Sequence, residues 1–287
     1  MPPLFIIMKT KRIMESVIHA IFLILGLITV ACVLLISIYL IVAGIPAISK
    51  IGIVKFLFKT KWAPTYASPV YGILPFILTS IYGTCGAIVI GVPIGFFCAV
   101  YLSKVASKKV KNIVGHAISM LAGIPSVVYG LVGMLILVPG IRKIFHVPDG
   151  SSLLAAMIVL AIMILPSIIK VSITSLDAVP KEYEDASLAL GANEIETYFR
   201  VSVTAAKSGI ITSIVLGVGR AIGEAMAVMM VSGNVPNMPK LFESVRFLTT
   251  AVASEMSYAA GLQRQALFSI ALVLFVFIML INSCLNL

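Results

Sequence analysis

The stretch Val179–Ala206, VPKEYEDASLALGANEIETYFRVSVTAA, is the one soluble-looking helical passage in a chain that is otherwise strongly apolar. Pro180 suits the first position of a helix. Glu182 and Glu184 follow in the first turns, where the positive end of the helix dipole favours carboxylates. Gly191 can take the left-handed conformation that ends a helix. The stretch therefore predicts a helix that begins near Pro180 and ends at Gly191.

A second short helix is predicted directly after this glycine. Asn193 and Glu196 have the spacing of an N-cap and its reciprocal partner three residues on, so the helix begins near Glu194. The apolar residues of the two helices form a candidate docking face for another protein: Ala186, Leu188, Ala189, Leu190, Ile195, Tyr198 and Phe199. The local pattern leaves open an alternative, a solvated amphipathic connector between two membrane spans.

The composition indicates an integral membrane protein. Of the 287 residues, 60% are hydrophobic and 11% are charged, and the mean hydropathy is +1.13. A water-soluble domain of this size needs more polar surface than this chain supplies. No linker, charge block or low-complexity segment marks a second domain, so we expect residues 1–287 to form a single all-α transmembrane domain.

Six apolar segments are long enough to cross a membrane. They are Val17–Ala43, Pro75–Leu102, Ile113–Val138, Ser151–Ser175, Ser208–Ser232 and Ala266–Leu285. An even number of spans places both termini and the opening stretch on one side. A slight excess of Lys and Arg on that side favours a cytoplasmic N-terminus.

The segments between these spans are expected to lie at the membrane surface. Ile45–Ser68 is interpreted as an interfacial loop with Trp62 and Tyr66 at headgroup level. Pro139–Gly150 and the longer Gly233–Gln265 are interpreted as loops on the outer side.

Two spans carry features that indicate special packing. Gly91 and Gly95 have the GxxxG spacing that lets another helix approach closely. Pro125 lies within the third span, in AGIPSVVYGLVG, and predicts a kink or a break. Such a break is tolerated at membrane depth only where neighbouring protein or a cavity satisfies the freed carbonyl, and it is often part of a transport path.

Arg220 and Glu224 are the charged residues of the fifth span, in GVGRAIGEAMAVMMVSGN. They are four residues apart, which predicts one helix face and mutual neutralisation. One interpretation is a buried ion pair that only orients the helix. The other is that Arg220 transiently meets an anion in a transport path while Glu224 keeps it from trapping that anion.

Several functional classes have little support in the sequence. The net charge is +10, but Lys and Arg are scattered in short loops without interleaved aromatic residues, so lipid headgroups or an anionic substrate are better partners than nucleic acid. The four cysteines and three histidines show no metal or redox spacing. No hydrolase motif or P-loop is present, so we expect no catalytic residue, no metal and an energy source in another chain or an ion.

The opening stretch resembles the cytoplasmic loop of ABC-importer permeases. The family pattern is Glu-Ala-Ala, three residues, Gly, nine residues, Ile-x-Leu-Pro. We match Glu184, Ala186 and Gly191 to it, with Asp185 in place of an alanine and Thr204 in place of the proline. The resemblance implies that residues 177–207 are a cytoplasmic coupling loop that docks in a groove of an ATPase subunit. The coupling residues would be Glu184, Asp185, Ala186, Leu190 and Gly191.

A more specific resemblance is to the phosphate-specific ABC permeases. It rests on Leu121–Gly133, Leu165–Gly191 and Gly219–Asn234, and RAIGEAMAVMMVSGN is closer to the C-type membrane subunit than to the A-type. It implies a type I permease of about six spans in the prokaryotic cytoplasmic (inner) membrane, with Arg220 and Glu224 in the phosphate path.

The resemblance also implies partners. These are a second, A-type permease, two copies of an ATP-binding subunit, an extracytoplasmic phosphate-binding protein and membrane lipid. ATP would be bound by the partner subunit, so this chain would hold no cofactor and would not itself be an enzyme. The alternatives are an ABC permease for another oxyanion, such as sulfate or molybdate, and an ion-coupled secondary transporter. The secondary transporter should show repeated halves, and no convincing internal repeat is found.

Overall fold

The computed structural model of the chain describes residues 4–285, which are almost entirely helical. The helices are α1 (Leu4–Ile51), α2 (Ile53–Phe58), α3 (Leu74–Val100), α4 (Lys108–Gly123), α5 (Ser126–Val132), α6 (Val138–Phe145), α7 (Leu153–Asp177), α8 (Lys181–Ala189), α9 (Glu194–Thr197), α10 (Val203–Ala205), α11 (Lys207–Gly223), α12 (Met226–Val231), α13 (Leu248–Glu255) and α14 (Gly261–Leu285). Three turns are π-helical: η1 (Tyr101–Val105), η2 (Gly133–Leu137) and η3 (Tyr198–Ser202). Two short antiparallel strands are β1 (Trp62–Ala63) and β2 (Val70–Tyr71).

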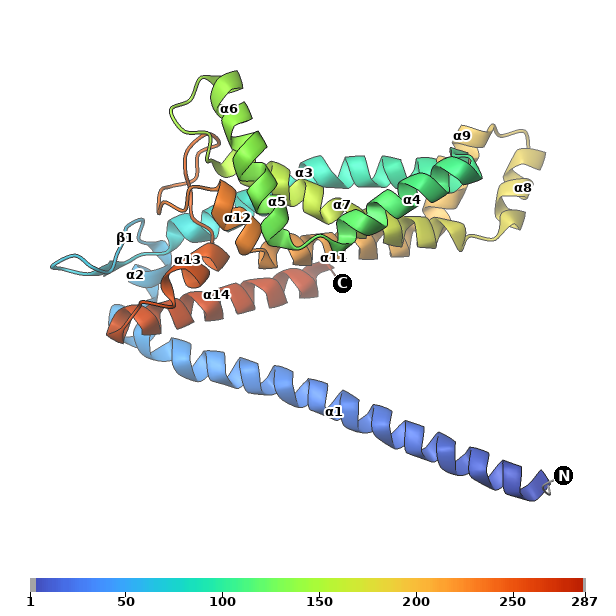
Figure 1. Cartoon of the computed structure of the whole chain (residues 1–287), viewed down its shortest axis with the longest axis horizontal. Helices are drawn as coiled ribbons and strands as arrows, with labels where there is room; N and C mark the ends of the chain where they lie inside the picture. The colour runs from blue at the N-terminus through green and yellow to red at the C-terminus, as the bar shows by residue number, and fades with distance from the viewer. Residues whose placement is uncertain (1–3, 286–287) are drawn as a thin grey trace.

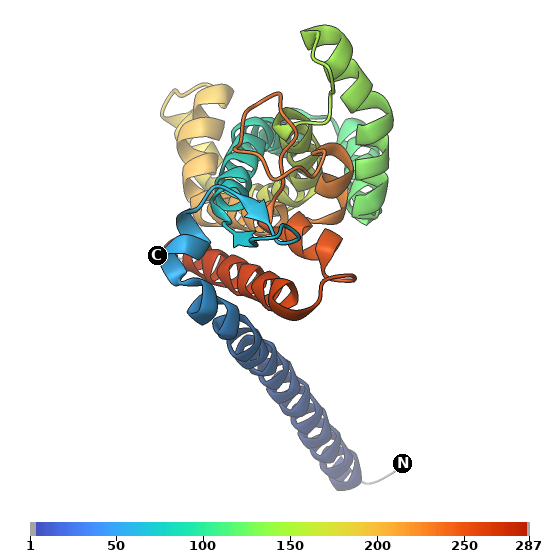
Figure 2. The ribbon, with the colours of Figure 1, turned by 90° about the vertical axis from the view of Figure 1, so that its left-hand side faces the viewer.

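Helices α3, α7 and α11 form the centre of the molecule (Figure 1). Helices α8 and α9 lie at one end of this bundle, and the β1–β2 hairpin, α2 and α13 lie at the other end. Figure 2 shows the bundle from the hairpin end, with α1 leaving it at a steep angle. The start of α1 lies at the same end as α8 (Figure 1), as an even number of crossings requires.

Glycines on α3 allow the closest helix contact of the core. A Cβ at Gly91 would lie 2.9 Å from Ile164 Cδ1 and 3.1 Å from the Ala161 carbonyl oxygen, both on α7. A Cβ at Gly95 would lie 2.9 Å from Ile168 Cγ2, also on α7. The expected close approach at the GxxxG spacing is therefore confirmed, and α7 is the helix that approaches.

Helix α1 is attached to the bundle only near its C-terminal end. There the Ser269 hydroxyl of α14 donates to the Gly44 carbonyl oxygen at 2.5 Å, and Ala47 is fully buried. Every side chain from Met14 to Ile36 is exposed in the isolated chain. Since these side chains are almost all apolar, lipid or another membrane protein must cover them.

The expected spans are confirmed in outline. Within the described residues, five helices are long and apolar enough to cross a membrane, namely Met14–Ile51, Leu74–Val105, Ser126–Phe145, Leu153–Asp177 and Gly261–Ser283. A sixth is counted if Glu194–Ala205 and Lys207–Gly223, which are bent by 72°, form one span. The first, second, fourth and sixth expected spans therefore correspond to single helices.

The expected third and fifth spans are each interrupted. The third, expected over Ile113–Val138, is divided at Pro125, and the membrane-crossing part runs instead from Ser126 to Phe145. The expected outer loop from Pro139 is therefore helical in its first half, as α6. The fifth, expected over Ser208–Ser232, is divided after Gly223, where Glu224 has extended backbone angles.

The outer loops also pack more deeply than expected. Trp62, expected at headgroup level, is 6% exposed and packs edge-on against Tyr71, so it belongs to the protein interior. Its indole nitrogen donates to Glu255 at 3.2 Å. Glu255 also pairs with Arg246 and accepts a hydrogen bond from Gln263 at 2.9 Å. The segment Gly233–Gln265 therefore combines an exposed loop, which includes Val235 and Met238, with a packed part that contains α13.

We predict that Gly91→Leu destabilises the helix bundle. The new side chain would meet the Ala161 carbonyl on α7, and overpacking of a tight contact costs about 1–3 kcal/mol. The measurement is the melting temperature of the detergent-solubilised chain. Gly26→Leu is the control, because no atom lies within 4 Å of a Cβ at Gly26. Equal melting temperatures for the two variants would contradict the close packing of α3 on α7.

Candidate functional site

The two interrupted spans lie against each other beside their breaks. Helix α5 packs on α12 so closely that a Cβ at Gly130 would lie 2.8 Å from Ala227 Cα. A Cβ at Gly133, which lies on η2, would lie 2.8 Å from Val231 Cγ1, which also belongs to α12. Because α5 begins right after the first break and α12 right after the second, the contact brings both irregular segments to one region.

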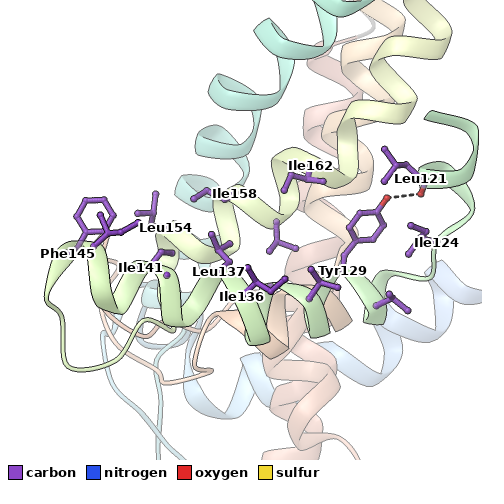
Figure 3. A pocket seen from close by; sticks show the side chains of 16 residues that line it. Leu121, Ile124, Tyr129, Ile136, Leu137, Ile141, Phe145, Leu154, Ile158 and Ile162 are labelled. Atoms are coloured by element: carbon purple, nitrogen blue, oxygen red, sulfur yellow. Dashed lines mark hydrogen bonds between the residues drawn. The ribbon is translucent and has the colours of Figure 1, made fainter. Parts of the chain in front are cut away.

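The first break is stabilised by a tyrosine. The Tyr129 hydroxyl on α5 donates to the Leu121 carbonyl oxygen on α4 at 2.7 Å, across the extended residues Ile124 and Pro125 (Figure 3). The Leu121 carbonyl also accepts the Ile124 backbone N–H at 3.2 Å, so the tyrosine adds a second, side-chain donor at the end of α4. The structure therefore places Pro125 between two helices that a side chain bridges.

An apolar groove of about 770 Å³ runs from this break along α5, η2 and α6 to α7 (Figure 3). Its wall includes Ile136, Ile144, Phe145 and Ile158. Such a surface suits lipid tails or an apolar helix, and it offers an anion no charge and almost no hydrogen-bond donor. The groove is therefore not the candidate anion site.

Arg220 and Glu224 do not form the expected ion pair. Helix α11 ends at Gly223, so Glu224 leaves the helix, and the expectation of one shared helix face is wrong. The Glu224 carboxylate accepts a hydrogen bond from the Ala227 backbone N–H at 3.0 Å, and its carbonyl accepts one from the Thr249 hydroxyl at 2.8 Å. Glu224 therefore stabilises the second break instead of neutralising the arginine.

Arg220 is a half-buried cation beside both breaks. Among the side chains that the structure describes, residues 14–283, no carboxylate pairs with it. It lies in the last turn of α11, next to the second break, which the contact of α5 with α12 brings near the first. An unneutralised guanidinium at such a position is costly, which makes it a candidate for binding an anion.

At the opposite end, residues 177–207, the predicted coupling loop, form the two expected helices. Helix α8 ends at Ala189, Gly191 follows the cap residue with a φ of +92°, and the Gly191 and Ala192 N–H groups donate to the Leu188 and Ser187 carbonyls at 2.9 and 3.2 Å. This is the Schellman arrangement that requires glycine. Asn193 caps α9 through the Glu196 N–H at 2.8 Å.

The predicted coupling loop exposes a cluster of apolar side chains. Leu190, at the bend, is 90% exposed, and Ile195 is 68% exposed. Ala186 and Leu188 are exposed beside them, whereas Phe199 turns back toward Phe96 and Phe97 of α3 with ring centroids 6.5 and 6.4 Å away. From here on, the docking face means four of the seven residues predicted to dock another protein: Ala186, Leu188, Leu190 and Ile195.

Glu184 points into the molecule rather than outward. Its carboxylate pairs with Lys104 of η1 at 2.5 Å and accepts a hydrogen bond from the Ser202 hydroxyl of η3 at 2.7 Å. Burial alone would raise the pKa of Glu184, but the hydrogen bonds from Lys104 and Ser202 and the charges of Lys104 and Lys181 outweigh burial and lower this pKa. The carboxylate is therefore ionised at neutral pH. No pattern in the sequence singles out Lys104 or Ser202.

The match to the family pattern shifts by one residue. Three residues separate Ser187 from Gly191, whereas four separate Ala186 from Gly191. The positions of Glu-Ala-Ala are therefore Asp185, Ala186 and Ser187, and the nine-residue spacing to Val201 still holds. Asp185 is exposed on α8, so the acidic residue of the pattern faces outward while Glu184 faces inward.

A second ion pair lies near Glu184. The Asp177 carboxylate, at the end of α7, accepts hydrogen bonds from the Ser103 hydroxyl at 2.6 Å and from Lys111 of α4 at 2.7 Å. These side chains are more exposed than Lys104 and Glu184. Among the described residues, no three His, Cys, Asp or Glu side chains are grouped as metal ligands.

The chain is similar to several membrane components of transporters. Residues 91–287 match the family model of the binding-protein-dependent transport system inner membrane component. The probable ABC transporter permease protein YqgH of Bacillus subtilis is 38% identical over 266 residues, which are 90% of this chain and 86% of that protein. The phosphate transport system permease protein PstC of Haemophilus influenzae is 34% identical over 90% of this chain and 86% of that protein.

The fold is likewise found in solved transporters. An inward-facing structure of the MetNI methionine ABC transporter has a TM-score of 0.55 and 18% identity, covering 75% of this chain and 91% of that chain. A crystal structure of an amino acid ABC transporter has a TM-score of 0.52 and 20% identity, covering 75% and 90%. With its family match and its five to six membrane helices, the chain is a multi-pass protein of the inner membrane, and it belongs to the inner membrane components of binding-protein-dependent transport systems.

Proposed function

We propose that the chain is the C-type permease subunit of an ATP-driven importer of inorganic phosphate, and that it forms the translocation path with a second, A-type permease. The observation that carries this proposal is the unpaired Arg220 beside two broken spans. It is supported by relatives named as phosphate transport system permeases, which are 31–35% identical in five different bacteria and archaea. The chain belongs to a binding-protein-dependent family, which disfavours the alternative of an ion-coupled secondary transporter.

Arg220 would act as the counter-charge for phosphate at membrane depth. A guanidinium offers several N–H donors in a planar fork that fits two oxygens of phosphate at once. Glu224 would then have a positioning role, because its carboxylate already accepts the Ala227 N–H and its backbone accepts Thr249. In this arrangement Glu224 keeps the second break open without neutralising the arginine.

The coupling loop would connect this path to ATP hydrolysis in two copies of a partner subunit. The docking face offers exposed apolar side chains, and Asp185 lies on the same helix with its carboxylate exposed. ATP-driven closure of the partner subunits would push on α8 and α9 and rock the membrane helices around the path. The loop and the start of α1 would then both be cytoplasmic.

An extracytoplasmic binding protein would deliver phosphate at the opposite end. The surface there is formed by the β1–β2 hairpin and by the packed segment around α13 (Figure 1). Glu255 joins these segments to α14, because it binds Arg246 and Trp62 and also accepts a hydrogen bond from Gln263 of α14. To identify the transported oxyanion, we would measure whether sulfate or molybdate inhibits the uptake of labelled phosphate. A phosphate permease should show little inhibition by either.

We predict that Arg220→Gln lowers phosphate uptake by at least about tenfold, since a desolvated anion loses the positive charge of the guanidinium. Arg220→Lys should keep part of the uptake, because lysine retains the positive charge but lacks the two parallel N–H donors of the guanidinium. The measurement is labelled phosphate uptake by cells that carry the variant as their sole copy. Arg264→Gln, at an exposed arginine, is the control. Wild-type uptake by Arg220→Gln would remove Arg220 from the path.

We also predict that Leu190→Asp weakens binding of the ATP-binding subunit by roughly 30-fold, because burial of a leucine contributes about 2 kcal/mol. The measurement is the amount of ATP-binding subunit that co-purifies with the chain. The control is Val235→Asp, an exposed apolar residue at the opposite end of the molecule. Equal co-purification of both variants would contradict docking at the bend.

A further inference from the structure

We propose that Lys104 is a positioning residue for transport, which ties the coupling loop to the end of α3 through Glu184 so that a push on the loop moves the membrane helices. Lys104, Glu184 and Ser202 together are called the Lys104 tether. The inference rests on the proposed function in one respect, since it takes α8 to be part of the loop that meets the ATPase.

The geometry of the tether joins three parts of the chain at one ammonium group. Lys104 Nζ lies 2.5 Å from Glu184 Oε1 on α8 and donates to the Leu176 carbonyl oxygen on α7 at 3.0 Å. The same Glu184 oxygen accepts the Ser202 hydroxyl at 2.7 Å. The ends of α3 and α7, the helix α8 and the return segment η3 therefore converge on one pair of charges.

Burial distinguishes this pair from the other charges at this end of the molecule. The side chains of Lys104 and Glu184 are 10% and 19% exposed, and Ser202 is fully buried. Lys108 and Lys109, a few residues further on, are exposed, and the Lys111–Asp177 pair is 35% and 40% exposed. A pair shielded from water resists screening, and loss of one partner leaves the other without compensation.

Helix α8 depends on this link because it has little other contact with the membrane helices. None of its residues is buried, and its main contacts are with α9 and η3 of its own loop. Within the loop, the Ser187 and Thr197 hydroxyls bond at 2.9 Å and close the bend. The loop is thus a small unit of its own, and Lys104 is the charged side chain that attaches its first helix to α3.

The local backbone turns both partners of Glu184 toward it. Lys104 lies on the π-helical turn η1, which closes with the Ala106 N–H donating to the Tyr101 carbonyl at 2.8 Å, and Ser202 lies on the π-helical turn η3. Such turns carry one extra residue and are frequent at functional sites. Beneath the tether, Val100, Val179 and Ile210 form an apolar cluster that excludes water.

The test uses the purified complex of the chain with its second permease and ATP-binding subunits in proteoliposomes. We expect Lys104→Met to retain its ATP-binding subunits but to lose at least about tenfold in phosphate transported per ATP hydrolysed, because Glu184 is left unpaired. Lys104→Arg should keep the ratio close to that of the parent. The charge-swapped double variant Lys104→Glu with Glu184→Lys should recover most of the ratio that either single change removes. Lys108→Met is the matched control.

A second measurement reports on the tether independently of the substrate. Hydrogen exchange of the same complexes should be faster over residues 181–189 in Lys104→Met than in the parent and in Lys108→Met, because α8 has lost its attachment. An unchanged transport-to-hydrolysis ratio in Lys104→Met, or loss of its ATP-binding subunits like that of Leu190→Asp, would overturn the tether. So would a charge-swapped variant no better than the single ones. If the parent complex transports no phosphate, the proposed function fails, and exchange over residues 181–189 still decides the tether.

Discussion

The backbone groups freed at two helix breaks set the main constraint on this structure. Within a membrane such groups need partners from the protein, because lipid offers none. The Tyr129 hydroxyl serves the first break and the Glu224 carboxylate serves the second, with the Thr249 hydroxyl on its carbonyl. Because Glu224 is used for this purpose, it does not pair with Arg220, and no other carboxylate among residues 14–283 does so either. The position of Glu224 therefore has two consequences: it stabilises the second break, and it leaves Arg220 available to an anion.

The sequence was sufficient for the features that depend on local chemistry. A proline at position 125, a glycine with positive φ at position 191 and an Asn cap at position 193 all act on their own backbone, so their positions predict helix ends. Long apolar runs likewise predicted the uninterrupted spans. The misplaced start of the third span has the same cause, since a continuous apolar run does not show on which side of a proline the crossing helix lies.

Features that depend on distant residues could not be predicted from the sequence. The four-residue spacing of Arg220 and Glu224 indicates a shared face only while the helix continues, and Gly223 ends it. Trp62 looks like an interfacial residue until Glu255, 193 positions away, supplies a buried acceptor. Lys104 stands among several lysines after a span, and only its contact with α8 distinguishes it.

The two adjacent acidic residues of α8 show how one short helix can serve two purposes. Successive residues of an α-helix are about 100° apart around its axis, so neighbouring side chains point in different directions. Glu184 is therefore held inside by Lys104 and Ser202, while Asp185 stays exposed beside the docking face. An inward charge attaches the helix to the membrane domain and an outward charge is available to a partner. A helix with no buried residue of its own can transmit a push only if such an attachment exists, because exposed contacts alone would let it slide over the bundle.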